Sequence, residues 1–181
     1  YGNTAGPGSS PVTLNTYYDL ASVTKVTATT VSIMKLAEEG KVNIDKTIGD
    51  YLPWVKGNAK EKITLKDLLL HQAGLFPYIK FYESLLQKDG SFKQGLVSNK
   101  IDQTHHQFIS PNKYLIDNWS DTIKNQILKS PVTEPGKYVY SDNDFIFLGK
   151  IVEQISGMSL DEYTRKNFYN KMGMYSNQIY Q

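Results

Sequence analysis

Three serines in this chain are each followed three positions later by a lysine, a spacing that can pair a nucleophilic hydroxyl with an activating amine. The pairs are Ser22 with Lys25, Ser32 with Lys35, and Ser110 with Lys113. Residues three apart share one face of a helix, so the amine can reach the hydroxyl. Because lysine is common in this chain, one or two such pairs arise by chance, and the surrounding sequence must select among them.

Only Ser22 lies where an extended segment passes into a helix. Ser32 falls in the middle of the expected helix, and Ser110 precedes a proline, which disfavours helix. At a helix start, unpaired backbone N–H groups and the positive end of the dipole stabilise a developing oxyanion. A partly desolvated lysine there has a lowered pKa and serves as a base. An equally good interpretation of this segment alone is that Ser22 caps the helix and Lys25 lies on the surface.

A second candidate for the chemistry is Tyr140, in the segment PGKYVYSDND. A short extended stretch before a helix cap can point its phenol into a cleft, and a phenolate beside a lysine is a reasonable general base for a serine. The alternative is a half-buried aromatic that covers a helix end. The chain has 13 tyrosines, which makes that alternative strong for any one of them.

The composition is that of a globular chain forming one domain or part of a larger one, with 181 residues, 40% of them hydrophobic and 21% charged. A net charge of +2 and scattered lysines give no argument for nucleic-acid binding. The lack of cysteine excludes disulfides and thiolate chemistry. We expect no cofactor and no metal, since the adjacent His105 and His106 point in different directions and are expected to be solvent exposed.

Helical periodicity predicts the elements that position these residues. We expect helices over residues 22–39, from the cap Thr64 to near Gly74, from Ser120 to Pro131, from a cap at Asp142 or Asn143 to Gly157, and from the capping box at Ser159 onward. Residues 76–118 show no clear period and are expected to be irregular with short helices. Within them, the aromatics of residues 75–82 either line a pocket or form a covered hydrophobic patch. The chain should contain at least five helices and very little strand.

Together these segments resemble the serine β-lactamase and penicillin-binding-protein superfamily, most closely its class C-like branch of esterases and D-aminopeptidases. The nucleophile segment of that branch resembles YDLASVTKVTATT, and its LLxHxSGL stretch resembles ITLKDLLLHQAGL. Its Tyr-x-Asn segment and PLGM turn resemble PGKYVYSDNDFIFLGKIVEQISGMSLDEY and FYNKMGM. The order and spacing agree from about residue 14 to residue 174. The stretches YDLASVTKV and HQAGL also resemble the β-lactamase-type domain joined to glycoside hydrolase family 3 modules.

The resemblance implies a mixed α/β fold of the β-lactamase and transpeptidase type, and a role for each matching residue. Ser22 would be the acylated nucleophile, with its backbone N–H as half of the oxyanion hole. Lys25 would activate Ser22 and hold charge in the pocket. Tyr140 would take the proton and later help water to attack the acyl-enzyme. His71 occupies the position of a family histidine that looks structural.

Two departures from the family pattern bear on activity. Asp142, the expected substrate contact, stands where the family usually has Asn, and its carboxylate can only accept hydrogen bonds. Beside Lys25 it favours the ammonium form and argues against β-lactam hydrolysis. The family's Lys/His-x-Gly strand does not appear after residue 143. We therefore expect residues 1–181 to be a single partial domain, truncated on its C-terminal side, mainly the helical part with most of the antiparallel sheet missing.

Two functions remain open. The first is a periplasmic or secreted serine acyl hydrolase that forms an acyl-enzyme with a small-molecule or peptide substrate. That substrate would be an ester, an amide or a D-amino-acid peptide, including peptidoglycan fragments. The second is a catalytically inactive module of the same fold that binds or scaffolds beside a fused or associated glycoside hydrolase module.

Overall fold

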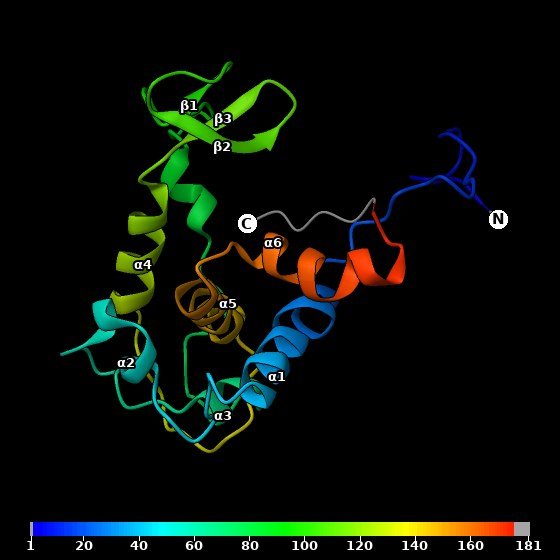
Figure 1. Ribbon diagram of the computed structural model, residues 1–181. Coiled ribbons are helices and arrows are strands. Elements are labelled where there is room, and N and C mark those ends of the chain that lie inside the picture. Colours follow the sequence, from blue (N-terminus) through cyan, green and yellow to red (C-terminus); the bar gives the residue numbers. More distant parts are fainter. Residues whose placement is uncertain (1, 176–181) are drawn as a thin grey trace.

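The computed structural model describes residues 2–175 and shows a long central helix, α5 (Asp142–Ser156), surrounded by shorter helices (Figure 1). The other α-helices are α1 (Val31–Glu38), α2 (Ile48–Tyr51), α3 (Leu65–Leu69), α4 (Trp119–Lys129) and α6 (Leu160–Thr164). Three short turns of 3₁₀-helix are η2 (Pro53–Val55), η3 (Phe81–Leu85) and η5 (Asn170–Met172). Two segments are π-helical: η1 (Lys25–Thr30) and η4 (Arg165–Tyr169).

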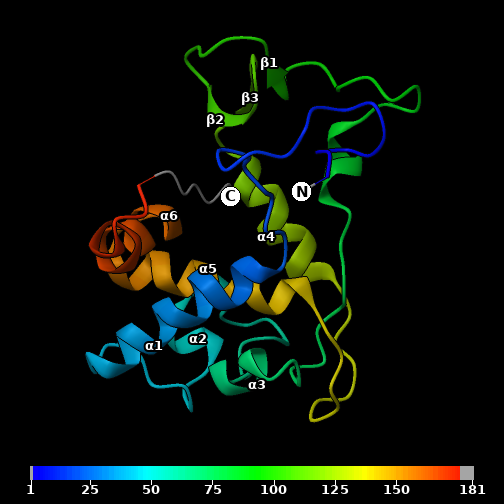
Figure 2. The ribbon, with the colours of Figure 1, turned by 90° about the vertical axis from the view of Figure 1, so that its right-hand side faces the viewer.

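A small antiparallel sheet stands at one end of α4, away from α2 and α3 at the opposite end of the molecule (Figure 2). Its strands are β1 (Val97–Ser98), β2 (His105–Ser110) and β3 (Lys113–Ile116), in the order β1-β3-β2. The described residues are thus mainly helical with one small sheet, which confirms the expected mixed α/β class with its dominant helical part.

The hydrophobic core lies between α5 and the helices around it. The core residues with no exposed surface include Leu36, Ile48, Leu68, Phe147 and Ile151. Burying each such side chain contributes about 1.5–3 kcal/mol, so this cluster holds α5 in place against α1, α2 and α3. Within residues 2–175, no helix is both long and apolar enough to cross a membrane.

The segment that begins at Ser22 departs from the single regular helix expected over residues 22–39. It opens as a turn at Ala21 and Ser22, has two α-helical residues, widens into the π-helix η1, and continues as α1 from Val31. The Thr30 hydroxyl donates to the carbonyl of Lys25, five residues earlier, at 2.9 Å, and so supports the wider turn. Such π-helical turns occur often at functional sites. The expected stop at Gly40 is present, with a φ of 68°.

Helix α3 begins as expected but ends early. Thr64 caps it by accepting a hydrogen bond from the backbone N–H of Asp67, as the sequence predicts. The helix stops at Leu69 rather than near Gly74, because His71 adopts a left-handed backbone conformation with a φ of 54°. Residues 71–77 leave the helix and form a loop that contacts the segment before α5.

The expected caps of α4 and α5 are wrong by one to two residues. Ser141 caps α5 by accepting from the N–H of Asn143, and this frees Asp142 to face another element. Helix α4 follows Asn118, and Ser120 lies inside its first turn. The expected ends are confirmed, since α4 stops before Pro131 and α5 stops at Gly157 in a left-handed conformation.

Residues 76–118 contain the sheet that the sequence did not predict. Two register irregularities interrupt the pairing of β2 with β3, between His105 and Gln107 and between Phe108 and Ser110. Bulges of this kind break the alternation of buried and exposed residues, so no strand period is visible in the sequence. The expected short helix is present in this stretch as η3.

Candidate active site

Ser22 lies exposed at the tight turn that opens this helical segment. Ala21, just before it, has a φ of 43°, which a residue with a side chain rarely adopts. The N–H of Ala21 donates to Asp19 Oδ1 at 2.8 Å and holds the turn. The carbonyl of Ser22 accepts the N–H of Lys25 at 3.1 Å, so the hydroxyl stands at the start of the helix. Strained backbone of this kind is typical of functional sites.

Three side chains meet at the Ser22 hydroxyl. Lys25 Nζ donates to Ser22 Oγ at 2.9 Å, and the Tyr140 hydroxyl lies 2.7 Å from the same oxygen. The Lys25 ammonium also stands 5.1 Å from the centre of the Tyr140 ring. Serine, a cation and a phenol at these distances are the components of an activated nucleophile.

Asp142 completes the cluster from the first turn of α5. Its Oδ1 accepts a hydrogen bond from Lys25 Nζ at 2.6 Å, in an ion pair whose lysine side chain is 14% exposed. Burial alone would lower the pKa of Lys25, but the hydrogen bonds and charges of Asp142 and Tyr140 outweigh burial and raise it. Lys25 is therefore an ammonium at neutral pH.

Behind Tyr140 lies a buried pair formed by His71 and Asp144. His71 Nδ1 is 2.6 Å from Asp144 Oδ2, and the N–H of Ser141 points at the same nitrogen at 3.3 Å. Burial and the charge of Lys25 lower the pKa of His71, while burial raises the pKa of Asp144 to about 8. The pair is thus neutral at pH 7, with Asp144 donating its proton to Nδ1.

The His71 ring packs directly against the catalytic tyrosine candidate. The centres of the His71 and Tyr140 rings are 4.6 Å apart, and Phe145 packs on the histidine at 5.2 Å. The backbone of the same loop fixes the tyrosine segment. The N–H of Val139 donates to the carbonyl of His71 at 2.8 Å, and that of Asp142 donates to the carbonyl of Pro77 at 2.9 Å.

Gly74 allows this loop and the tyrosine segment to approach each other. It has a φ of 68°, and a Cβ at this position would lie 2.5 Å from the carbonyl oxygen of Thr133. That distance is too short for any side chain. The N–H of Thr133 donates to the carbonyl of Gly74 at 2.8 Å, so the segments around Gly74 and Thr133 are in direct contact at a point where only glycine fits.

Ser22 and Lys25 line one side of a cleft of about 1190 Å³. Its walls come from η1, α4, α5 and the strand β2. Most of its lining is apolar, and the aromatic members are Trp54, Phe81, Phe108, Trp119 and Phe145. The volume exceeds the 300–1,000 Å³ or so that is usual for small-molecule pockets, so a substrate larger than its reacting group fits here.

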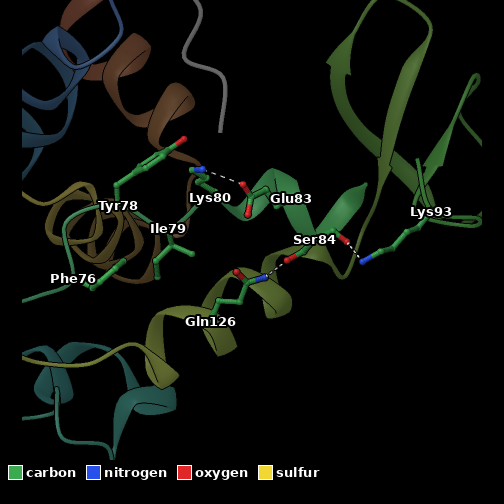
Figure 3. A pocket seen from close by; sticks show the side chains of 8 residues that line it. All are labelled: Phe76, Tyr78, Ile79, Lys80, Glu83, Ser84, Lys93 and Gln126. Carbon is green, nitrogen blue, oxygen red and sulfur yellow. Dashed lines mark hydrogen bonds and ion pairs between the residues drawn. The ribbon is translucent and has the colours of Figure 1, made fainter. Parts of the chain in front are cut away.

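A second pocket, of about 580 Å³, lies beside η3 and α4 (Figure 3). There the amide of Gln126 donates to the Ser84 hydroxyl at 2.7 Å, and Lys93 donates to the Ser84 carbonyl at 2.9 Å. None of the residues around Ser22 lines this pocket. Of the aromatics in residues 75–82, Phe76 and Tyr78 line this second pocket, while Phe81 lines the cleft beside Ser22.

The structure brings together all four site residues chosen from the sequence: Ser22, Lys25, Tyr140 and Asp142. The other two candidate serines lie elsewhere, since Ser32 is buried inside α1 and Ser110 ends β2. Asn143 does not replace the family asparagine, because its amide donates to the carbonyl of Phe76 at 2.6 Å.

The expected solvent exposure of the histidine pair is half wrong. His105 is buried and bonded to Asp102 and to the carbonyl of Gly95, whereas His106 is exposed and bonded to Asp117. In residues 2–175, no group of three or more histidine, aspartate or glutamate side chains is placed to hold a metal ion.

Asp144 is the site residue that sequence reasoning missed. Its signal was available in the helical phase of α5. Residues three, four and seven positions later are Phe147, Leu148 and Ile151, all fully buried, so Asp144 had to lie on the buried face. A buried carboxyl needs a partner, and the loop that carries His71 supplies it.

Comparison with known proteins is consistent with this geometry. Residues 1–181 match the family described as Beta-lactamase. A "Putative D-alanyl-D-alanine carboxypeptidase" of Salmonella paratyphi A is 34% identical over 170 residues, which are 90% of this chain and 34% of that protein. The chain therefore spans about a third of the length of the curated relatives that it matches.

Solved structures with the same fold support the family match. The octameric penicillin-binding protein homologue from Pyrococcus abyssi is similar with a TM-score of 0.58 and 25% identity, over 85% of this chain and 31% of that one. The class C beta lactamase from Rhodobacter sphaeroides gives a TM-score of 0.60 at 22% identity, over 96% and 40% of the two chains. These likenesses confirm the expected fold.

Proposed function

This chain belongs to the beta-lactamase family, and from that premise we propose that its protein is a serine acyl hydrolase acting through an acyl-enzyme. The observation that carries the proposal is the position of Ser22 Oγ. It lies within hydrogen-bonding distance of both Lys25 Nζ and the Tyr140 hydroxyl. A serine nucleophile needs a neighbouring base, and that base needs a neighbouring charge to stabilise it.

Tyr140 rather than Lys25 is the base in this proposal. Asp142 raises the pKa of Lys25 against the opposing effect of burial, and an ammonium has no lone pair with which to accept a proton. The Lys25 charge instead stabilises a Tyr140 phenolate. The proton of Ser22 passes to that phenolate across 2.7 Å while Ser22 Oγ forms its bond to the acyl carbon of the substrate.

The same groups complete the reaction. Tyr140 gives its proton to the leaving alcohol or amine as the bond to the acyl carbon breaks, which leaves Ser22 acylated. A water molecule then gives a proton to the Tyr140 phenolate while its oxygen attacks the acyl carbon. The bond from Ser22 to that carbon breaks, Ser22 regains its proton from Tyr140, and the carboxylic acid product leaves.

The substrate class in this proposal is an ester, an amide or a D-amino-acid peptide. The putative D-alanyl-D-alanine carboxypeptidase among the relatives supports a peptide derived from peptidoglycan, and with it a periplasmic or secreted location. Hydrolysis of β-lactams is not included. Asp142 supplies a carboxylate where the family pattern has an amide that donates to the substrate carbonyl.

One observation favours a second candidate, a module of the same fold that is catalytically inactive. Lys25 Nζ is closer to Asp142 Oδ1 than to Ser22 Oγ, at 2.6 Å against 2.9 Å. A lysine that is ion-paired with a carboxylate stabilises a neighbouring phenolate less. Such a module would keep the fold and the cleft without turning over a substrate.

A pre-steady-state burst separates the two candidates. The complete gene product that carries this chain is mixed with p-nitrophenyl acetate, and p-nitrophenolate release is followed by stopped flow. An acyl-enzyme predicts a rapid burst of one equivalent, followed by slower turnover. Ser22→Ala should abolish the burst, whereas Ser110→Ala, which removes a serine with the same spacing to lysine, should keep it. If Ser22→Ala releases p-nitrophenolate as the unmodified protein does, the hydrolase proposal is contradicted and the inactive module is favoured.

A further inference from the structure

The cleft beside Ser22 carries an inference about the acyl group, which rests on the proposed function. Besides the aromatics, aliphatic residues of two helices line it, among them Ile123 and Ile127 of α4 and Ile146 of α5. Phe145 stands near Lys25, since its ring centre lies 6.0 Å from Lys25 Nζ. The apolar wall therefore begins beside Lys25, where the acyl carbon has to lie, and continues along α4 and α5.

The charged side chains at this cleft are already paired within the chain. Lys124 donates to Asp121 at 3.0 Å, and Lys150 donates to Glu153 at 2.8 Å. Lys25 is held by Asp142, as described above. A charged ligand in this cleft would leave water without gaining an unpaired partner, so the cleft favours an uncharged one.

The walls are preformed. Trp54 stacks on the buried Phe147 with ring centres 5.7 Å apart and an angle of 17° between the planes. Phe108 of β2 packs edge-on against Tyr114 of β3 at 6.1 Å. Side chains fixed in this way lose little freedom when a ligand binds, which favours affinity for an apolar chain.

We propose that this cleft is the acyl-group site and that it takes a long, uncharged aliphatic acyl chain. The acyl group of a peptidoglycan peptide is its D-alanyl residue together with the peptide chain before it, and the amide groups of that chain would lose water against an apolar wall. Burying each methylene contributes roughly 0.8 kcal/mol, or a factor of about three to four. The kcat/KM should therefore rise about threefold for every methylene added to the acyl group, until the cleft is full.

Gly149 offers a way to block the cleft without touching the nucleophile. It lines the cleft from the middle of α5, and the nearest atom to a Cβ there is Leu160 Cδ2, in ordinary contact at 3.9 Å. Gly149→Ala should therefore fold well, because alanine is favoured over glycine inside a helix. Gly149→Leu should place its side chain in the space that the acyl chain needs.

The experiment compares p-nitrophenyl acetate, butyrate, hexanoate and octanoate as substrates of the complete gene product. In Gly149→Leu, the ratio of kcat/KM for octanoate to that for acetate should fall by at least tenfold. Gln154→Leu puts the same side chain on an exposed position of α5 and should keep the ratio. Equal kcat/KM for all four esters, with an intact burst, would overturn this inference and leave the proposed function standing.

A second readout does not depend on turnover. The chain has two tryptophans, Trp54 and Trp119, and both line the cleft. Titration with octanamide, an uncharged analogue of the acyl chain, should change their fluorescence, and acetamide should not. Gly149→Leu should weaken the octanamide effect at least tenfold. If the protein gives no burst but octanamide changes the fluorescence, the hydrolase proposal is refuted and the apolar site is supported. If octanamide gives no response, the apolar site itself is refuted.

Discussion

Lys25 Nζ lies 2.6 Å from Asp142 Oδ1, closer than the 2.9 Å to the hydroxyl of Ser22. One cation is thus shared between a nucleophile and a carboxylate that comes from 117 residues further along the chain. Asp142 stands where the family pattern has an asparagine, so this pair is a point at which the chain departs from that pattern.

Replacing Asp142 with asparagine should remove the negative charge that binds the Lys25 ammonium. In Asp142→Asn the pKa of Lys25 should fall, because burial lowers it and the main opposing interaction is gone. More of the charge then acts on Tyr140, so the pH at which Ser22 reaches half of its maximal reactivity should fall. The measurement is the rate of Ser22 modification by a fluorophosphonate between pH 5 and pH 10.

The matched control for this variant is Asp121→Asn, which removes the carboxylate paired with Lys124 at the edge of the cleft. It makes the same change of charge without touching Lys25, so its pH profile should follow that of the unmodified protein. An unchanged profile in Asp142→Asn would show that the ion pair does not govern the reactivity of Ser22.

Tyr140→Phe should remove the general base of the reaction. The ring still packs on His71, but the hydroxyl 2.7 Å from Ser22 is lost. Loss of a general base typically lowers the rate by about 10²–10⁴. Tyr138→Phe is the control, since Tyr138 also packs on His71, edge-on at 5.9 Å, but is largely exposed. A loss of less than about threefold in Tyr140→Phe would assign the base to another group.

The buried pair predicts how stability changes with pH. Burial raises the pKa of Asp144 to about 8, far above that of an unfolded carboxyl, so between about pH 4 and pH 8 Asp144 holds a proton in the folded protein that it lacks in the unfolded chain. This group therefore makes the protein less stable as pH rises through that range. Asp144→Asn keeps a donor for His71 Nδ1 and does not titrate.

The expected result is a melting temperature for Asp144→Asn that exceeds that of the unmodified protein by more at pH 8 than at pH 5. Thermal melts at the two pH values measure it, with Asp121→Asn as an exposed control. The opposite order would mean that Asp144 is ionised and pairs with a charged His71, in disagreement with the N–H of Ser141 that points at the same nitrogen.

Replacing the buried Lys60, far from the active site, should destabilise the protein. Its side chain is 1% exposed, and its ammonium donates to the carbonyls of Leu128 and Ser130 at the end of α4, at 3.2 and 2.6 Å. Lys60→Met should leave the Ser130 carbonyl without its Lys60 donor and the Leu128 carbonyl with Asn58 alone, and lower the free energy of unfolding by about 1–3 kcal/mol. Urea unfolding measures the loss, and Lys62→Met, at an exposed position, should cost little.

Local signals in the sequence predicted the parts of the fold that local interactions determine. The cap at Thr64, the capping box from Ser159 to Glu162 and the stop at Gly157 each depend on a few neighbouring residues. The early end of α3 was not predictable in this way. His71 adopts its left-handed conformation in a loop whose hydrogen-bond partners lie 59 or more residues later.

In the candidate site, too, local contacts were predictable from the sequence and long-range contacts were not. The contact of Lys25 with Ser22 follows from their spacing on one helical turn. Tyr140 was a candidate base from its own segment, but its contact with Ser22 spans 118 residues, and no spacing rule predicts it. The walls of the cleft come from segments as distant as Trp54, Phe108 and Leu160. No pattern of spacing brings such segments together, because the fold as a whole decides which of them meet.

The central claim is that Ser22 is an activated nucleophile, and intact-protein mass after reaction with a fluorophosphonate tests it most directly. The account predicts one adduct on the complete gene product, its absence in Ser22→Ala, and its retention in Ser110→Ala and Ser32→Ala. No adduct on the folded protein, or an adduct that survives in Ser22→Ala, would contradict the claim.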